Sequence, residues 1–133
     1  MEPMESLAKG VLAGRRVLIV EDEYFLAEDF RQILVERGAE VLGPVATLGD
    51  GLRIVESPDR IDLAVLDVRL RDKDVFAISA ALKSRNIPFV FATGFGELQI
   101  PQAYEGVPRL EKPFERGALI AAIEAACASN RPE

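Results

Sequence analysis

Three carboxylates follow apolar segments of the chain at points where they could gather around one ion. Glu21 and Asp22 come directly after VLIV at residues 17–20, and Asp67 comes directly after IDLAVL at residues 61–66. Carboxylates within a few ångströms of one another repel, so the bare cluster is costly. A hard divalent cation removes that cost, and Mg²⁺ prefers one or two direct carboxylates with waters and phosphate oxygens. These residue types predict a magnesium site.

Two further residues, Thr93 and Lys112, extend this chemistry to a phosphoryl group. A hydroxyl and a compact ammonium could together bind the oxygens of a phosphoryl group that is bonded to a carboxylate. Asp67 is the natural nucleophile because it stands alone at the end of its segment, whereas the other two acids are adjacent. Pro113 follows Lys112, and a cis bond between them could aim the lysine back over the site.

Each of these features also has a plainer interpretation when it is taken alone. An acidic turn after a strand is usually solvated, an aspartate often caps a turn, and Thr-Gly and Lys-Pro are common in loops. The joint pattern is harder to reach by chance, because four suitable residue types each follow a different apolar segment of one expected sheet. The pattern therefore favours one site over four unrelated loops.

Apolar segments alternate with segments of helical spacing, and this alternation decides where the polar residues can meet. Continuous apolar runs are typical of strands buried on both faces of a parallel sheet. The alternation predicts an α/β fold with helices on both faces, and in such folds sites form beyond the carboxyl ends of the strands. Gly96, Pro101 and Gly106 predict that any helix within residues 95–106 is short or distorted. The expected strands cover residues 15–20, 40–43, 61–66, 89–92 and 107–110, and the expected helices cover residues 23–37, 47–57, 74–85 and 115–128.

Composition narrows the classes of function. The chain has 133 residues, which suits one domain, and its net charge of −6 argues against direct binding of nucleic acid. It has no histidine, which removes histidine-based catalysis and the usual zinc sites. A single cysteine, Cys127, fits a reducing compartment. No apolar run has the length of a membrane span and the N-terminus does not resemble a secretory signal, so we expect a soluble, cytoplasmic protein.

The motifs VLIVEDE, AVLDVRL, FATGF and LEKPF occur in this order, and with them residues 15–129 resemble the receiver domain of two-component response regulators. The resemblance implies a flavodoxin-like (βα)5 three-layer sandwich, with a five-stranded parallel sheet in the order 2-1-3-4-5 and five helices. Residues 1–14 would then be an N-terminal extension or linker, and residues 130–133 a short tail. We expect no output domain, so the effect of this chain would pass through contacts with another protein.

The same resemblance implies a role for each candidate residue. Asp67 would be the phosphoacceptor. Asp22 would bind Mg²⁺ directly together with Asp67, Glu21 would bind it through water, and the backbone carbonyl of Arg69 would complete the protein ligands.

The resemblance also implies how the phosphoryl group is held and where it comes from. Thr93 and Lys112 would contact the phosphoryl oxygens. The donor would be a phosphohistidine on a sensor histidine kinase or a histidine phosphotransferase, and the receiver of the signal would be a downstream protein. Nucleic acid, membrane and small-molecule substrates are not expected as partners. Beyond slow self-dephosphorylation of Asp67, we expect no enzymatic activity.

The stretch PFVFATGFG at residues 88–96 narrows the resemblance to alphaproteobacterial receivers marked by Pro-Phe-x-Phe-Ala-Thr-Gly-Tyr, the FAT GUY receivers. Three residues depart from the wider family pattern. Arg109 replaces the usual aromatic switch residue, Phe95 replaces the tyrosine after Thr-Gly, and Arg71 replaces a common proline. Our hypothesis is that phosphorylation instead reorders residues 94–106, with Phe95 as a packing toggle.

Three alternatives compete with a stand-alone receiver. The chain could be a receiver domain excised from the C-terminal end of a hybrid sensor histidine kinase. A Mg²⁺-dependent phosphatase with an aspartyl nucleophile is a distant alternative, because such enzymes need a second Asp where this chain has Arg69. A flavodoxin-like binding module that has lost phosphorylation would lack Asp67, Thr93 or Lys112, and none is lacking.

Overall fold

The computed structural model describes residues 12–71, 73–94 and 100–129. Phe95 and the predicted tail at 130–133 lie outside the described residues, as does most of the predicted extension at 1–14. None of the helices that the structure describes is both long and apolar enough to cross a bilayer. In chain order, the elements are β1 (Arg16–Val20), α2 (Tyr24–Glu36), β2 (Glu40–Val45), α3 (Leu48–Glu56), β3 (Leu63–Asp67), α4 (Phe76–Ser84), β4 (Phe89–Thr93), the 3-10 helix η1 (Gln102–Tyr104), β5 (Arg109–Glu111) and α5 (Arg116–Ser129).

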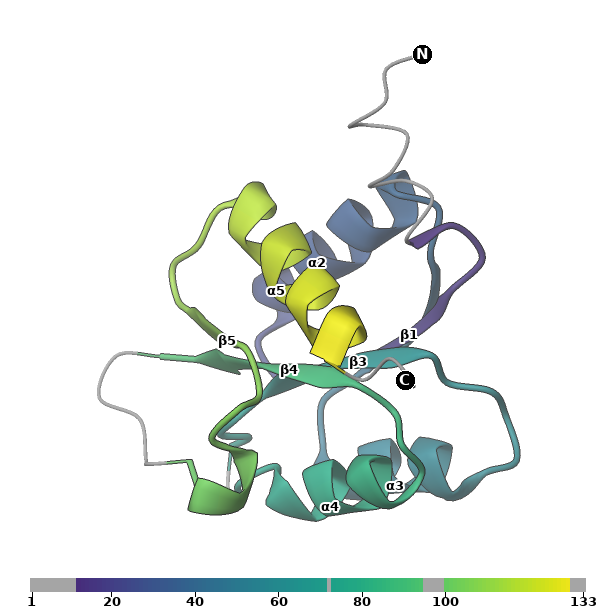
Figure 1. The fold of residues 1–133 in the computed structure, drawn as a ribbon, viewed down its shortest axis with the longest axis vertical. Coiled ribbons are helices and arrows are strands. Elements are labelled where there is room, and N and C mark those ends of the chain that lie inside the picture. The colour runs from purple at the N-terminus through teal and green to yellow at the C-terminus, as the bar shows by residue number, and fades with distance from the viewer. Residues whose placement is uncertain (1–11, 72, 95–99, 130–133) are drawn as a thin grey trace.

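The five strands form one parallel sheet in the order β2-β1-β3-β4-β5. Figure 1 shows α2 and α5 on one face of this sheet and α3 and α4 on the other, which gives three layers. The predicted flavodoxin-like sandwich and strand order are confirmed. Sites in this fold form at the carboxyl ends of the strands, so the order places the ends of β1 and β3 side by side.

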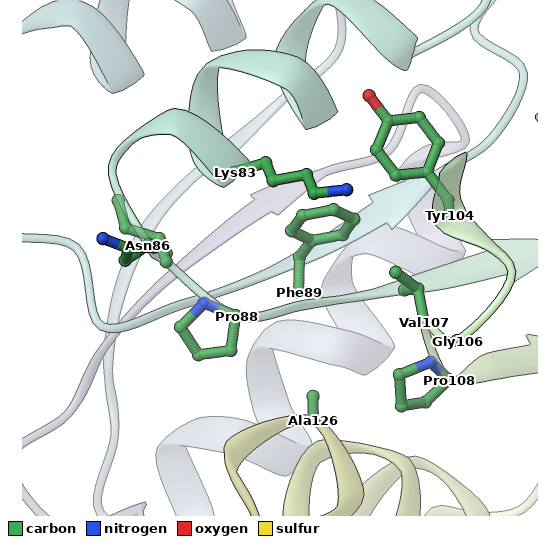
Figure 2. Close-up of a pocket in the computed structure, with 10 residues that line it drawn as sticks. Lys83, Asn86, Pro88, Phe89, Tyr104, Gly106, Val107, Pro108 and Ala126 are labelled. Carbon is green, nitrogen blue, oxygen red and sulfur yellow. The ribbon is translucent and has the colours of Figure 1, made fainter. Parts of the chain in front are cut away.

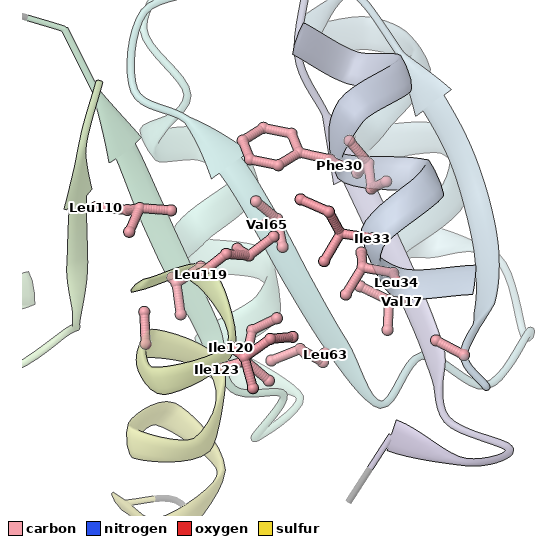
Figure 3. Close-up of a cluster of buried hydrophobic side chains, with 14 of the residues drawn as sticks. Val17, Phe30, Ile33, Leu34, Leu63, Val65, Leu110, Leu119, Ile120 and Ile123 are labelled. Carbon is pink, nitrogen blue, oxygen red and sulfur yellow. The ribbon is translucent and has the colours of Figure 1, made fainter. Parts of the chain in front are cut away.

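Two apolar cores hold the sheet between its helices. Along β1, Val17 and Ile19 pack toward α2 and α5, whereas Leu18 and Val20 pack toward α3 and α4. Figure 3 shows the first core, where Phe30 and Leu119 belong to the helices that cover the central strands. Burial of each such side chain contributes about 1.5–3 kcal/mol. The strand ends are therefore fixed by packing on both faces.

Two details differ from the sequence-based expectations. The resemblance implies five helices, but the described part of the chain has four α-helices, and η1 stands between β4 and β5. Pro101 and Gly106 flank η1, and both residue types disfavour a longer helix, as their positions in the sequence predict. Strand β2 was expected to end before Pro44, but it continues to Val45. A proline is tolerated there because β2 lies at the edge of the sheet.

Replacement of Gly43 by alanine is expected to destabilise the fold by about 2 kcal/mol. Gly43 has φ +90, and an added Cβ would lie 2.8 Å from the nitrogen of Val45 and 3.0 Å from the carbonyl oxygen of Ile19. Both contacts are with backbone, which cannot rotate away. Gly49→Ala is the matched control, because a Cβ at this helical position meets nothing within 4 Å. Urea unfolding measures both variants, and equal midpoints would contradict the prediction.

Candidate functional site

Strands β1 and β3 bring the three predicted carboxylates to one point. Val20 pairs with Leu66, so Glu21 and Asp67 follow neighbouring positions on adjacent strands. Carboxylate oxygens of Glu21, Asp22 and Asp67 lie within 4.8 Å of one another. Glu21 and Asp67 are each only 2% exposed, whereas Asp22 is half-buried. The structure therefore gathers two buried acids and one accessible acid at the same edge of the sheet.

Strands β4 and β5 add the two predicted partners of these acids. Thr93 is the last residue of β4 and is half-buried, and its carbonyl oxygen accepts a hydrogen bond from the amide of Lys112 at 2.8 Å. The Lys112 ammonium lies 3.5 Å from Glu21 Oε1 and 3.4 Å from Asp67 Oδ1. The peptide bond between Lys112 and Pro113 is cis. One ammonium is thus shared between the two buried carboxylates.

Glu21 is the residue on which the electrostatics of the site depend most. Its burial and the nearby charge of Asp67 raise its pKa from 4.5 to about 8, and the charge of Lys112 offsets part of this rise. Glu21 Oε2 accepts a hydrogen bond from the amide of Glu23 at 3.1 Å, but the buried Oε1 has no hydrogen-bond partner. The Lys112 ammonium at 3.5 Å forms an ion pair with this oxygen but no hydrogen bond, and buried polar atoms are normally hydrogen-bonded, so the oxygen can still accept one.

The donor set fits a hard divalent cation. Three carboxylates converge, one of them accessible to solvent, and a buried oxygen of Glu21 lacks a hydrogen bond. Oxygen ligands of this kind suit Mg²⁺, which also relieves the repulsion that raises the pKa of Glu21.

The loop after β3 places two arginines next to the acids. The backbone amide of Arg69 lies 3.4 Å from Asp67 Oδ1, and a β-bridge between Arg69 and Asp74 closes the loop. Arg71 Nε lies 3.8 Å from Asp22 Oδ2, and the side chain of Arg71 is 81% exposed. Sequence reasoning noted Arg71 only as a departure from a family pattern. The charged run RLRDKD directly after the predicted nucleophile is the signal that could have pointed to this ion pair.

The two predicted switch positions have different outcomes. Arg109 begins β5, is exposed, and belongs to a shallow surface with Ile100 and Glu105, apart from the acidic cluster. Phe95 is outside the described residues, so its role as a packing toggle stays a prediction. An exposed aromatic pair not singled out from the sequence, Tyr24 and Phe25, stands at the start of α2 with ring centroids 5.3 Å apart.

Residues 17–124 match the response regulator receiver domain family. Among curated proteins, the chain is 33% identical over 123 residues to the transcriptional regulatory protein PdtaR of Mycobacterium tuberculosis. That match covers 88% of this chain and 58% of PdtaR. The chain spans about half the length of the curated relatives that it matches.

Solved structures of receivers have the same fold. A response regulator receiver protein from Sinorhizobium medicae WSM419 matches with a TM-score of 0.77 and 26% identity, covering 89% of this chain and 98% of that chain. The solution structure of SdrG from Sphingomonas melonis Fr1 matches with a TM-score of 0.73 and 33% identity, covering 85% of this chain and 96% of that chain.

Proposed function

Because this chain belongs to the response regulator receiver domain family, we propose that it accepts a phosphoryl group on Asp67 in a two-component phosphorelay. One observation carries the assignment to this residue. Asp67 is buried at the carboxyl end of β3, where two further carboxylates and the Lys112 ammonium converge on it. The ammonium can stabilise the negative charge of a phosphoryl group on Asp67, and the carboxylates can hold a cation that does the same.

Receivers are signalling domains and not enzymes that turn over a substrate. We infer that the donor is a phosphohistidine on a sensor histidine kinase or a histidine phosphotransferase. An oxygen of the Asp67 carboxylate attacks phosphorus, the P–N bond to the histidine breaks, and a P–O bond forms. The nitrogen of the donor histidine leaves with the electron pair of the broken bond.

The other residues hold charge and position oxygens during this transfer. Asp22, Asp67 and the backbone carbonyl of Arg69 would hold Mg²⁺, and Glu21 would hold it through water. When bound, the ion supplies positive charge next to the transferred group. Lys112 neutralises charge on the phosphoryl oxygens from its place beside Asp67, and the hydroxyl of Thr93 donates a hydrogen bond to them. The phosphorylated chain then acts on a downstream protein through contact.

Intact mass spectrometry after incubation with Mg²⁺ and acetyl phosphate tests the proposal. The wild-type chain should gain one phosphoryl group, and Asp67→Ala should gain none. Asp59→Ala is the matched control because Asp59 is exposed in the loop that precedes β3 and lies outside the cluster. A wild-type chain without an adduct, or an Asp67→Ala chain that gains as much as the control, would end the proposal.

Stabilisation by Mg²⁺ is expected to grow as the pH rises from about 5 to about 8. Because the pKa of Glu21 is raised, its protonated carboxyl group stabilises the fold fully below pH 4.5. This stabilisation is lost as the pH rises through about 8. The loss is on the order of 3 kcal/mol for a group this buried. A bound dication favours the ionised carboxylate and offsets the loss. The stabilisation by Mg²⁺ is measured as the difference between the melting temperatures with Mg²⁺ and with EDTA, at several pH values between about 5 and about 8.

Glu21→Gln tests the assignment of this pH dependence. The amide does not titrate, so the melting temperature of this variant in EDTA should fall less between pH 5 and 8 than that of the wild type. Glu23→Gln is the matched control, because Glu23 is exposed and lies two residues away. If the wild type and Glu21→Gln respond equally to pH, Glu21 is not the responsible group.

A further inference from the structure

A hollow lies at the opposite end of the sheet from the acidic cluster. It has a volume of about 240 Å³ and opens between the start of β4, the segment from η1 to β5, and the ends of α4 and α5. Figure 2 shows Pro88 and Pro108 on two sides of it, Phe89 and Lys83 above, and Ala126 of α5 below. Phe89 begins β4, whereas Thr93 at the other end of this strand faces the phosphoacceptor end of the sheet.

Residue size and backbone stiffness explain why the hollow stays open. Gly106 has no side chain at the rim, and an added Cβ there would meet nothing within 4 Å. Ala126 is a small residue at the base and is 4% exposed. Pro88 and Pro108 have fixed φ angles, and Phe89 is anchored in the sheet, so these walls cannot easily move inward. These features keep the backbone and the aromatic wall of the hollow in place.

The walls of the hollow are apolar and aromatic, and its charge is positive. Ile87, Phe89 and Tyr104 line the hollow and are each less than a tenth exposed. Among the ten lining residues, Lys83 is the only charged one, although the chain as a whole carries −6. The neighbouring Glu105 does not line the hollow. A ligand with an apolar body and one negative group matches this lining.

Lys83 is held where it can meet such a group. Its ammonium donates a hydrogen bond to the carbonyl oxygen of Ala103 at 3.2 Å and lies 5.5 Å from the centre of the Tyr104 ring. The Tyr104 ring in turn stacks on Phe76 at the start of α4, with centroids 5.9 Å apart. An ammonium has three donors, so one bond to a carbonyl leaves capacity for a carboxylate. Two contacts thus fix the lysine beside the hollow and reduce the entropy lost on binding an anion.

We propose that this hollow is a binding site for a small organic carboxylate, with an apolar body about the size of a benzene ring in the cavity and the carboxylate on Lys83. The volume of the hollow sets the size of the ligand. The hollow has space for about eight waters of roughly 30 Å³ each, which is space for roughly ten non-hydrogen atoms of a ligand. A ligand of that size in an apolar pocket with one ion pair binds in the millimolar range or somewhat tighter. This inference does not depend on phosphorylation of Asp67.

Titration of the full chain with phenylacetate, followed by ¹H–¹⁵N NMR, tests the site. Phenylacetate has the required size and charge, and phenylacetamide has the same size without the charge. We expect saturable shifts of the amides of Ile87, Phe89 and Val107 with phenylacetate, and at least about fivefold weaker binding of phenylacetamide. Acetate alone should give no saturable shift, because it lacks the apolar body.

Two variants and one control separate this site from unspecific binding. Gly106→Leu places a side chain over the opening and should weaken phenylacetate binding at least about tenfold. Gly117→Leu is the matched control, because a Cβ at Gly117 also meets nothing within 4 Å and Gly117 does not line the hollow. Lys83→Gln should remove the preference for phenylacetate over phenylacetamide. The dispersion of the ¹H–¹⁵N spectrum, with unchanged amide shifts at the acidic cluster at the other end of the sheet, shows that each variant is folded.

Several results would overturn the proposal. These are the absence of saturable shifts at the lining residues, equal binding of the acid and the amide, and unchanged binding by Gly106→Leu. Light scattering tests the remaining possibility, that a second copy of this chain occupies the hollow. It would be supported if the wild type did not bind phenylacetate and if its molar mass in solution fell in Gly106→Leu but not in Gly117→Leu. The hollow would then be a contact between copies.

Discussion

Asp67→Asn is expected to abolish phosphorylation and at the same time to stabilise the metal-free protein. Both effects follow from loss of the Asp67 carboxylate, which is the proposed nucleophile and which is buried beside Glu21, with the Lys112 ammonium near both acids. Asparagine has almost the same shape but no charge, so the repulsion between the two acids disappears. The expected gain in the free energy of unfolding is about 2 kcal/mol near pH 8 in EDTA.

Urea unfolding in EDTA measures this gain, and intact mass after treatment with acetyl phosphate measures the loss of function. Asp67→Asn should also lower the pKa of Glu21, because the charge of Asp67 is the second cause of its rise after burial. The stability of the variant should therefore depend less on pH between 5 and 8 than that of the wild type. Asp59→Asn, at an exposed position, should behave like the wild type in each measurement. A less stable Asp67→Asn would show that the carboxylate is held by favourable contacts that outweigh the repulsion.

Lys112→Met is expected to have the opposite effect on stability. The variant keeps the length and the apolar part of the side chain but removes the ammonium, which lies 3.5 Å from Glu21 and 3.4 Å from Asp67. Two buried carboxylates then face each other without their shared counterion. We expect a loss of about 2 kcal/mol in EDTA near pH 8, less than for a fully buried pair because the lysine side chain is 21% exposed.

Mg²⁺ should recover most of this loss, because the ion takes over the neutralisation of the acids. The rate of phosphorylation by acetyl phosphate should still fall, by about a hundredfold, because one positively charged contact to the phosphoryl oxygens is missing. Lys73→Met, an exposed position in the loop after β3, carries the same change of charge and serves as the control. If Lys112→Met loses no more stability and no more rate than Lys73→Met, the ammonium has no special role.

The fold, and the edge of the sheet where the site residues come together, can be predicted from local patterns in the sequence. Strand β3 is a run of five buried residues, and a run of that kind predicts a central strand and places its last residue, Asp67, at the edge where sites form. The expected helix over residues 47–57 is also found, as α3, and it begins where a threonine can cap it: Thr47 accepts a hydrogen bond from the amide of Asp50 at 3.1 Å. These features depend on near neighbours in the chain, which is why periodicity and residue type are enough to find them.

Other features depend on neighbours that are distant in the sequence, and residue type alone does not reveal them. The pairing of Arg71 with Asp22 requires knowledge of how the loop after β3 turns back over β1. The hollow near Phe89 exists because Gly106 and Ala126, twenty residues apart, both lack bulk at one place. Pro44 reads as the end of a strand, but it lies within β2 because that strand is at the sheet edge. In each case the tertiary arrangement decides the outcome.

The chain has two tyrosines, which lie in different parts of the fold, and it has no tryptophan. Tyr24 is 69% exposed and lies two residues after Asp22, whereas Tyr104 is 8% exposed and lines the hollow. Incorporation of 3-fluorotyrosine therefore gives a spectrum of two ¹⁹F resonances without any substitution. One resonance reports on the start of α2, which directly follows Glu21, Asp22 and Glu23 in the chain, and the other reports on the hollow. Events at the two ends of the sheet can be followed separately in a single sample, with each resonance serving as the reference for the other.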